Sequence, residues 1–375
     1  IDSLTEDLNS LEARTIIRQL SSQAVTVLEN KEEILPFTHL DKKRFGVISV
    51  GKQNAQPFVK RLQEYAPIEN ISRLNTQSTD KEIKGIVDVI SHSTQTIIAI
   101  FSDKKEEIQL AEKILKKATG KVLVFFTSPY SIPKYEELTA EAEAIIVAYE
   151  NNPVMQECAA EVLFGGTSAD GKLPVSTGKY PQGSGIFIPE CRLGHAFPEE
   201  VDMDSRILSR IDSIVQEGID SMAFPGCQII IPRHKKIIYD RAFGYFDYEK
   251  KRPVSTNDLY DLASITKAMG TLPAIMWLND HEQVSLNAPL CFYLPEMRDY
   301  GLSAITLRQT LMHESGLPAG ISLRRLLIDP DSYSAPLLKR GRDSEYPIQV
   351  DKDWFVQKDC RLKPWLFHNK TSRSY

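Results

Sequence analysis

Apolar runs alternate with amphipathic stretches along the first half of this chain, and this alternation limits the folds that it can adopt. Runs such as 96–101 and 121–127 are almost continuously apolar, as expected for parallel strands that are buried on both faces. The stretches between the runs repeat apolar residues at helical spacing. Strands that alternate with such helices predict a parallel sheet with helices on both faces, in the α/β class. We expect strands at 44–50, 68–74, 96–101, 121–127 and 144–148, and helices at 57–65, 83–90, 106–117 and 154–163.

The alternation of apolar runs and amphipathic stretches ends after a glycine-rich segment at 164–174. Residues 176–204 hold four glycines and three prolines without periodicity, which predicts a linker. We therefore expect one domain at 1–176, a linker at 177–204 and a second domain at 205–375. For the second half, the pattern predicts a helix at 204–223, an antiparallel hairpin at 227–231 and 236–239, helices at 264–280 and 306–313, and irregular structure beyond 340.

Composition excludes several classes of protein. The 375 residues include 45 Lys and Arg against 50 Asp and Glu, so the chain lacks the basic excess of nucleic-acid-binding proteins. Apolar stretches such as 122–126 are far shorter than the ~20 residues of a membrane-spanning helix. The five cysteines form no CxxC pair and have no metal-ligand spacing. We expect no nucleic-acid partner, no membrane span, no metal and no cofactor.

The pattern Ser-x-x-Lys suggests a chemistry. Positions i and i+3 share one face of a helix, so the lysine can take the proton of the serine hydroxyl if burial or a neighbouring cation disfavours its charged form. Of six such pairs, only Ser264 and Lys267 begin a long helix with an apolar face. Spacing alone also fits a helix-capping serine with a surface lysine, and both interpretations stay open. The other five pairs lie in unsuitable contexts: Ser49/Lys52, Ser78/Lys81, Ser102/Lys105, Ser131/Lys134 and Ser176/Lys179.

The segment around Ser264, Asp258-Leu-Tyr-Asp-Leu-Ala-Ser-Ile-Thr-Lys-Ala-Met269, resembles the active-site segment of penicillin-binding and class C β-lactamase-like serine hydrolases. The flanking segments follow the order of that family: 225–231, 241–245, 284–290, 293–296 and 305–318. The last ends in His-Glu-Ser-Gly-Leu-Pro, which is similar to a family signature. The resemblance implies that Ser264 is the nucleophile and Lys267 the general base. It also implies that the backbone N–H of Ser264 forms half of an oxyanion hole.

His313 is a second candidate base in the same region. It lies at the end of a helix that Thr306 is expected to cap and that ends before Gly316. A histidine suits the negative end of a helix dipole. We therefore interpret His313 as structural, and the pattern of the family supports this.

The first half is similar to the C-terminal α/β sandwich of glycoside hydrolase family 3. Residues 12–30 and 35–36 resemble the entry of that domain, and 144–176 resembles its exit. Some proteins with a sandwich and a β-lactamase-like domain in this order begin with a barrel that resembles β-N-acetylhexosaminidases. The implied fold is a parallel-sheet α/β sandwich, followed by an incomplete α+β β-lactamase-like domain.

The chain departs from both families. The sugar-cleaving residues of family 3 lie mainly on the barrel, and no Glu here can be matched to the acid/base of the glucosidase branch. The serine hydrolase family also needs a Tyr-x-Asn-like motif and a Lys/His-Thr-Gly strand. Tyr375 lies just short of the first, and we assign it no role. We therefore expect a fragment truncated at both ends and inactive alone. Pro273 predicts a kink after Lys267.

The two resemblances together imply a bifunctional hydrolase, which combines glycoside hydrolysis with an acyl-enzyme reaction on Ser264. The expected substrates are small molecules, glycans or peptidoglycan, and the families suggest a periplasmic or extracellular location. Two alternatives remain open: a glycosidase accessory domain with an inert β-lactamase-like relic, and a non-catalytic binding module. A nucleotide-binding module is poorly supported, because the strand that ends at Gly51 is not followed by GxGxxG or a P-loop.

Overall fold

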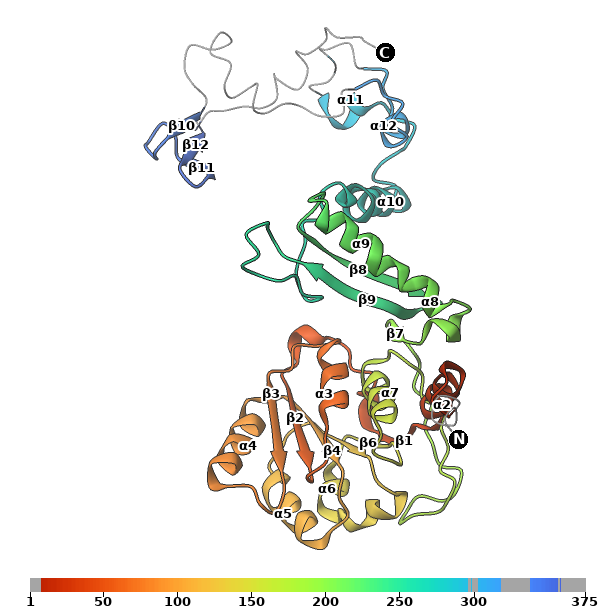
Figure 1. The fold of residues 1–375 in the computed structure, drawn as a ribbon. Helices are drawn as coiled ribbons and strands as arrows, with labels where there is room; N and C mark the ends of the chain where they lie inside the picture. Colours follow the sequence, from red (N-terminus) through yellow and green to blue (C-terminus); the bar gives the residue numbers. More distant parts are fainter. Residues whose placement is uncertain (1–7, 296–297, 299–302, 318–337, 357, 359–375) are drawn as a thin grey trace. The chain divides into compact units, whose positions relative to one another are not determined.

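The computed structural model describes residues 8–295, 298, 303–317, 338–356 and 358 (Figure 1). The chain divides into two compact units, Ile1–Asp258 and Leu259–Tyr375. The domain boundaries expected from the sequence, at 176/177 and 204/205, stay predictions. Tyr375 lies outside the described residues.

A six-stranded sheet lies at the centre of the first unit (Figure 1). Its strand order is β1-β6-β5-β4-β2-β3, and its neighbours are parallel except for β1, which pairs antiparallel with β6. The expected parallel strands and the α/β class are therefore confirmed. The strands are β1 (Thr26–Asn30), β2 (Phe45–Val50), β3 (Asn70–Leu74), β4 (Gln95–Ile100), β5 (Lys121–Phe125) and β6 (Ala144–Val147).

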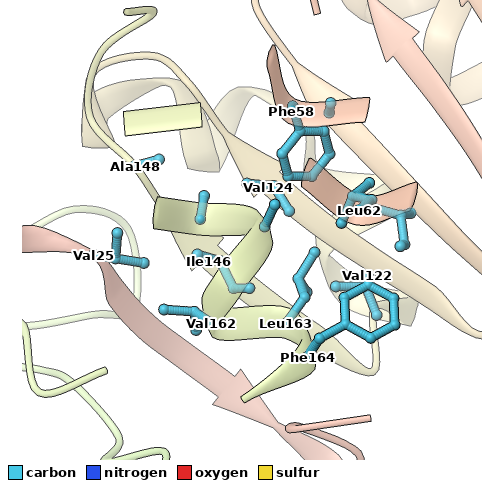
Figure 2. Close-up of a cluster of buried hydrophobic side chains, with 14 of the residues drawn as sticks. Val25, Phe58, Leu62, Val122, Val124, Ile146, Ala148, Val162, Leu163 and Phe164 are labelled. Carbon is cyan, nitrogen blue, oxygen red and sulfur yellow. The ribbon is translucent and has the colours of Figure 1, made fainter. Parts of the chain in front are cut away.

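Helices cover both faces of this sheet, because successive strand residues point to opposite sides. On β5, Val124 belongs to the core on the side of α3 and α7, whereas Phe125 belongs to the core on the side of α4, α5 and α6. Figure 2 shows the first core, in which Phe58 of α3 and Phe164 of α7 lie near the strands. The helices are α2 (Leu11–Ala24), α3 (Gln56–Gln63), α4 (Asp80–His92), α5 (Lys105–Leu115), α6 (Glu136–Glu141) and α7 (Pro153–Phe164).

Local sequence signals fix both ends of α7. The side-chain oxygen of Asn152 accepts a hydrogen bond from the N–H of Met155 at 2.8 Å, and Pro153 occupies the first turn. The helix ends at Gly165, whose φ of 72° is a left-handed conformation that glycine adopts without strain. From Met155 to Phe164 nearly every residue of α7 is buried. This helix is therefore part of the core rather than a cover on its surface.

Strand β1 was not predicted from the sequence. Its first residues are buried, but Glu29 and Asn30 make its second half polar and only partly buried. No α-helix separates β1 from β2, so the alternation of strands and helices could not reveal it. The sheet is therefore parallel with one antiparallel edge strand.

Residues 177–204 are irregular, as the sequence predicts, but they pack along the sandwich. The N–H of Ile186 donates to the carbonyl oxygen of Val27 at 2.7 Å, and Ile188 exchanges two backbone hydrogen bonds with Ala169. The segment also contains β7 (Gly194–His195) and the short 3₁₀ helix η4 (Pro198–Val201). Backbone pairing therefore attaches this segment to the first domain.

A second sheet of the first unit has the order β7-β9-β8. Strands β8 (Gly226–Arg233) and β9 (Lys236–Gly244) are antiparallel, which confirms the predicted hairpin. The helix predicted at 204–223 is instead two helices, α8 (Ser205–Leu208) and α9 (Arg210–Asp220). They meet at Ser209, whose hydroxyl donates to the carbonyl oxygen of Arg206 at 2.8 Å. Such local bonds of serine compete with helix continuation.

The second unit contains the helices expected at 264–280 and 306–313 in shortened form. The prediction of irregular structure beyond 340 is wrong, because residues 338–356 contain a three-stranded antiparallel sheet. Its strands are only three or four residues long, too short for a visible alternation of apolar residues. The elements are η5 (Lys267–Thr271), α10 (Leu272–Asp280), α11 (Leu290–Tyr293), α12 (Leu307–Leu311), β10 (Leu338–Arg340), β11 (Ile348–Asp351) and β12 (Trp354–Val356).

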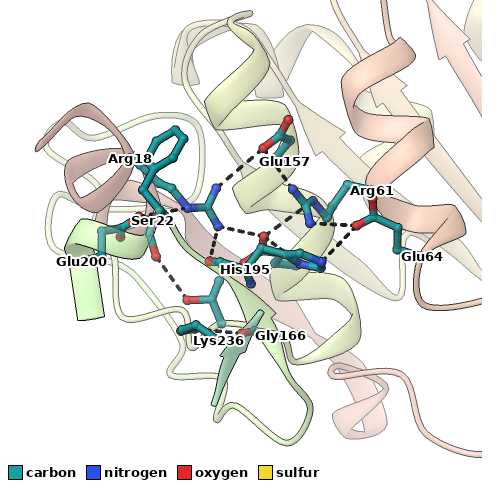
Figure 3. A network of polar contacts seen from close by, with 12 residues as sticks. Arg18, Ser22, Arg61, Glu64, Glu157, Gly166, His195, Glu200 and Lys236 are labelled. Carbon is teal, nitrogen blue, oxygen red and sulfur yellow. Dashed lines mark hydrogen bonds and ion pairs between the residues drawn. The ribbon is translucent and has the colours of Figure 1, made fainter. Parts of the chain in front are cut away.

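A buried ionic cluster joins α2, α3, α7, β7 and η4 of the first unit (Figure 3). A guanidinium nitrogen of Arg18 lies 2.8 Å from a carboxylate oxygen of Glu161, whose side chain is only 1% exposed. Burial by itself raises the pKa of Glu161, but the hydrogen bond from His195 and the charges of Arg18 and Arg61 outweigh it and lower the pKa to about 2. Glu161 is therefore ionised in the folded protein and depends on these partners.

Candidate active site

Ser264 and Lys267 lie side by side at the start of the helical segment that continues into α10. The Nζ of Lys267 donates a hydrogen bond to the Oγ of Ser264 at 3.0 Å. Ser264 directly precedes the first helical residue, Ile265, so its hydroxyl lies near the positive end of the helix dipole. The structure thus places the predicted pair in contact. Their roles as nucleophile and base stay a prediction.

The chain enters the helix through a turn with hydrogen bonds of the 3₁₀ type. Three successive N–H groups each donate to the carbonyl three residues earlier: Ile265 to Leu262, Thr266 to Ala263, and Lys267 to Ser264, at 2.9, 3.2 and 3.0 Å. Bonds of this kind are typical of a 3₁₀ turn, in which side chains three residues apart lie one above the other. The tight turn therefore aligns the serine and lysine side chains.

The chain then widens into a π-helical turn, η5, directly after the pair. The N–H of Leu272 donates to the carbonyl oxygen of Lys267, five residues earlier. Pro273 has no N–H to donate, and its ring excludes the carbonyl four residues before it from a normal α-helical position. The irregularity expected from Pro273 is therefore present as a wide turn, and α10 begins around the proline.

Two of the other Ser-x-x-Lys pairs have lysines that are engaged elsewhere. Lys134 forms an ion pair with Asp103 at 2.9 Å, and Lys179 forms one with Glu29. The hydroxyl of Ser176 accepts a hydrogen bond from the backbone N–H of Gln182 at 2.9 Å. Their contacts are those of structural residues.

His313 follows the last turn of α12, and its backbone N–H donates to the carbonyl oxygen of Thr310 at 3.2 Å. The side chain of Thr306 caps the start of this helix by accepting from the N–H of Gln309 at 3.1 Å. These positions at the two helix ends confirm the location predicted for both residues. The ring of His313 is exposed.

Two neighbours of Ser264 were not identified from the sequence. Ala263 has a φ of 43°, in the left-handed region, and its N–H donates to a carboxylate oxygen of Asp261 at 2.9 Å. An aspartate two residues before a sharp bend is a known turn signal, so Asp-Leu-Ala before the serine could have indicated it. Ala263 itself gives no sign of a bend, since alanine favours an ordinary α-helix.

The described part of the chain contains no group of three or more His, Cys, Asp or Glu side chains arranged to hold a metal ion. None of its helices combines the length and apolar character needed to cross a membrane.

Residues 211–346 match the family model described as Beta-lactamase. The chain contains a β-lactamase-like domain. This region includes the Ser264–Lys267 pair and the hairpin of β8 and β9. The β-lactamase-like part of the fold expected from the sequence is therefore confirmed.

Two curated relatives and one solved structure are similar to parts of the chain. Esterase EstB from Burkholderia gladioli is 33% identical over 125 residues, which are 32% of this chain and 32% of EstB. Protein flp from Staphylococcus aureus (strain NCTC 8325 / PS 47) is 31% identical over 116 residues, 30% of this chain and 23% of flp. The chain thus spans a third or less of the length of these relatives of the β-lactamase-like domain. A glycoside hydrolase family 3 β-N-acetylglucosaminidase from Paenibacillus sp. str. FPU-7 superposes with a TM-score of 0.37 and 19% identity, over 45% of this chain and 33% of that one.

Proposed function

We propose that the β-lactamase-like domain is a serine acyl-hydrolase in which Ser264 is the nucleophile and Lys267 the general base. The observation that carries this proposal is the 3.0 Å hydrogen bond between Lys267 Nζ and Ser264 Oγ at the start of a helix. Nucleophile and base within hydrogen-bonding distance are the geometric requirement for activating a serine. The match to the β-lactamase family and the 33% identity to an esterase support the same chemistry.

The reaction proceeds in two steps. Lys267 Nζ accepts the hydroxyl proton while Ser264 Oγ attacks the carbonyl carbon of an ester or amide. The lysine then gives this proton to the leaving group, and an acyl-enzyme remains on Ser264. In the second step, Lys267 takes a proton from water, whose oxygen attacks the acyl carbon. Lys267 then gives this proton to the departing Ser264 Oγ, which releases the acid and regenerates free Ser264. The backbone N–H of Ser264 stabilises the oxyanion in both steps.

The substrate that we propose is an ester or amide of bacterial cell-wall material, in a periplasmic or extracellular protein. This rests on the resemblance of the first half to glycoside hydrolase family 3, because hexosamine and peptide chemistry meet in peptidoglycan. The protein would then be bifunctional, with the glycoside-cleaving residues on a barrel domain that this chain does not contain. Muropeptides left uncut by the full-length protein would exclude this substrate.

The decisive experiment for the acyl-hydrolase is labelling of the full-length protein with a fluorophosphonate, followed by peptide mass spectrometry. We expect the label on Ser264 and its loss in Ser264→Ala. The Lys267→Met variant should be labelled about 10²- to 10⁴-fold more slowly, because it lacks the general base.

Ser176→Ala is the matched control, since Ser176 belongs to a Ser-x-x-Lys pair whose lysine is paired with Glu29. Its labelling should equal that of the unmodified protein. An unlabelled Ser264 in the intact protein would favour the alternative, an inert relic attached to a glycosidase.

A further inference from the structure

Ala263 has a backbone conformation that its side chain disfavours. Its φ of 43° lies in the left-handed region, where the Cβ of a residue other than glycine is crowded against its own backbone. Strained backbone persists only where its surroundings impose it, and it clusters at functional sites. Ala263 directly precedes the candidate nucleophile, so the strain lies at the point where the chain turns into the active-site helix.

This conformation is coupled to the tight turn that follows. The N–H of Ala263 is held by Asp261 at 2.9 Å, and its carbonyl accepts the second of the three successive bonds, from Thr266 at 3.2 Å. The third bond, from the N–H of Lys267 to the carbonyl of Ser264, closes the turn that brings the two side chains together. A change of φ at Ala263 would move its carbonyl and weaken the hydrogen bond from the N–H of Thr266.

We propose that Ala263 is a positioning residue: its left-handed backbone winds the 262–267 turn tightly enough to hold Ser264 Oγ against Lys267 Nζ. The expected effect on rate rests on the proposed acyl-hydrolase. The expected effect of Ala263 on the Ser264–Lys267 distance does not depend on that function. Ala263 contacts no reacting atom in this scheme and acts only through Ser264. A β-branched residue is excluded there, because its side chain strongly resists positive φ.

The test compares Ala263→Gly and Ala263→Val in the full-length protein. Glycine adopts positive φ freely, so we expect Ala263→Gly to retain the labelling rate and to unfold at the same or a higher temperature. Valine should force the turn open and slow fluorophosphonate labelling of Ser264 by about tenfold to hundredfold, as expected for a misplacement near 1 Å.

Glu282→Val is the matched control. Glu282 also has a left-handed φ, 57°, and lies in the same unit beyond the far end of α10. It should lose thermal stability as Ala263→Val does, yet keep the labelling rate. A double variant separates positioning from general destabilisation: Ala263→Val combined with Lys267→Met should be no slower than Lys267→Met alone, since the base is already absent.

Crystal structures of the Ala263→Val and Glu282→Val proteins supply a readout that does not depend on activity. We expect the Ser264 Oγ to Lys267 Nζ distance to exceed hydrogen-bonding range in the first and to stay near 3.0 Å in the second. If the unmodified protein is labelled and Ala263→Val reacts equally fast, the inference is wrong while the proposed function stands. If nothing is labelled, the proposed function fails, and an unchanged distance in Ala263→Val would overturn the inference as well.

Discussion

Arg18 lies at the centre of the buried ionic cluster of the sandwich, and its side chain is 7% exposed. We expect Arg18→Met to lower the free energy of unfolding by about 3 kcal/mol, because Glu161 then stays buried without its closest cation. Urea denaturation followed by far-UV circular dichroism measures this change.

The control is Arg206→Met, since Arg206 also pairs with a carboxylate at 2.7 Å, but its side chain is 87% exposed. Exposed pairs contribute little, and the unfolding midpoint should not move measurably. Equal losses in both variants would show that burial does not determine the importance of these pairs.

Individual residues differ in how far the sequence could predict them. The contact of Ser264 and Lys267 followed from a spacing of three residues at the start of an apolar helix, which is local information. The ion pair of Arg18 and Glu161 joins residues that are 143 positions apart in the sequence. A periodic pattern of apolar residues gives no information about a contact at such a separation. The left-handed φ of Ala263 could not be predicted either, because alanine strongly favours ordinary α-helix.

At the scale of elements, Pro273 determines where the helical segment that follows Ser264 changes its winding. Pro273→Ala restores a backbone N–H, and we expect the π turn at Lys267–Thr271 to close into a normal α-helical turn. The residues before the turn would then rotate by about 100° relative to α10, the angle that one helical residue spans. Labelling of Ser264 should slow by about tenfold or more, because the pair then faces another direction.

Thr271→Ala is the control for Pro273→Ala, since it changes the same turn and keeps the proline. Hydrogen exchange at the new amide of residue 273 reports directly whether the turn has closed. A protected amide together with unchanged labelling would show that the wide turn has no part in placing the serine.

Helices and strands were predictable where their apolar residues form a run or repeat that is long enough to recognise. The buried strand β5 and the hairpin of β8 and β9 were visible as apolar runs with clear ends. Strand β1 was not, because its polar second half and its antiparallel pairing lie outside the strand–helix alternation. The strands beyond 338 are too short to show any period.

For the whole molecule, the division into two compact units predicts that damage to one core spares the site in the other. Leu123 is fully buried in the sandwich, and Leu123→Ala should cost about 2–5 kcal/mol of stability. Below its unfolding transition, this variant should still label Ser264 at the normal rate, because Ser264 belongs to the other unit. Calorimetry and labelling at one temperature check both statements.

The matched variant is Leu307→Ala, because Leu307 is buried in the small core of the second unit, against which Ile275 of α10 packs. Its side chain supports the helix that continues from Ser264 and Lys267, so its removal should slow labelling even where the sandwich is intact. If Leu123→Ala instead slows labelling in proportion to its loss of stability, the sandwich and the serine site unfold as one cooperative body. The division into two compact units would then not predict which parts unfold independently. The Ser264 site would depend on the folded sandwich for its stability.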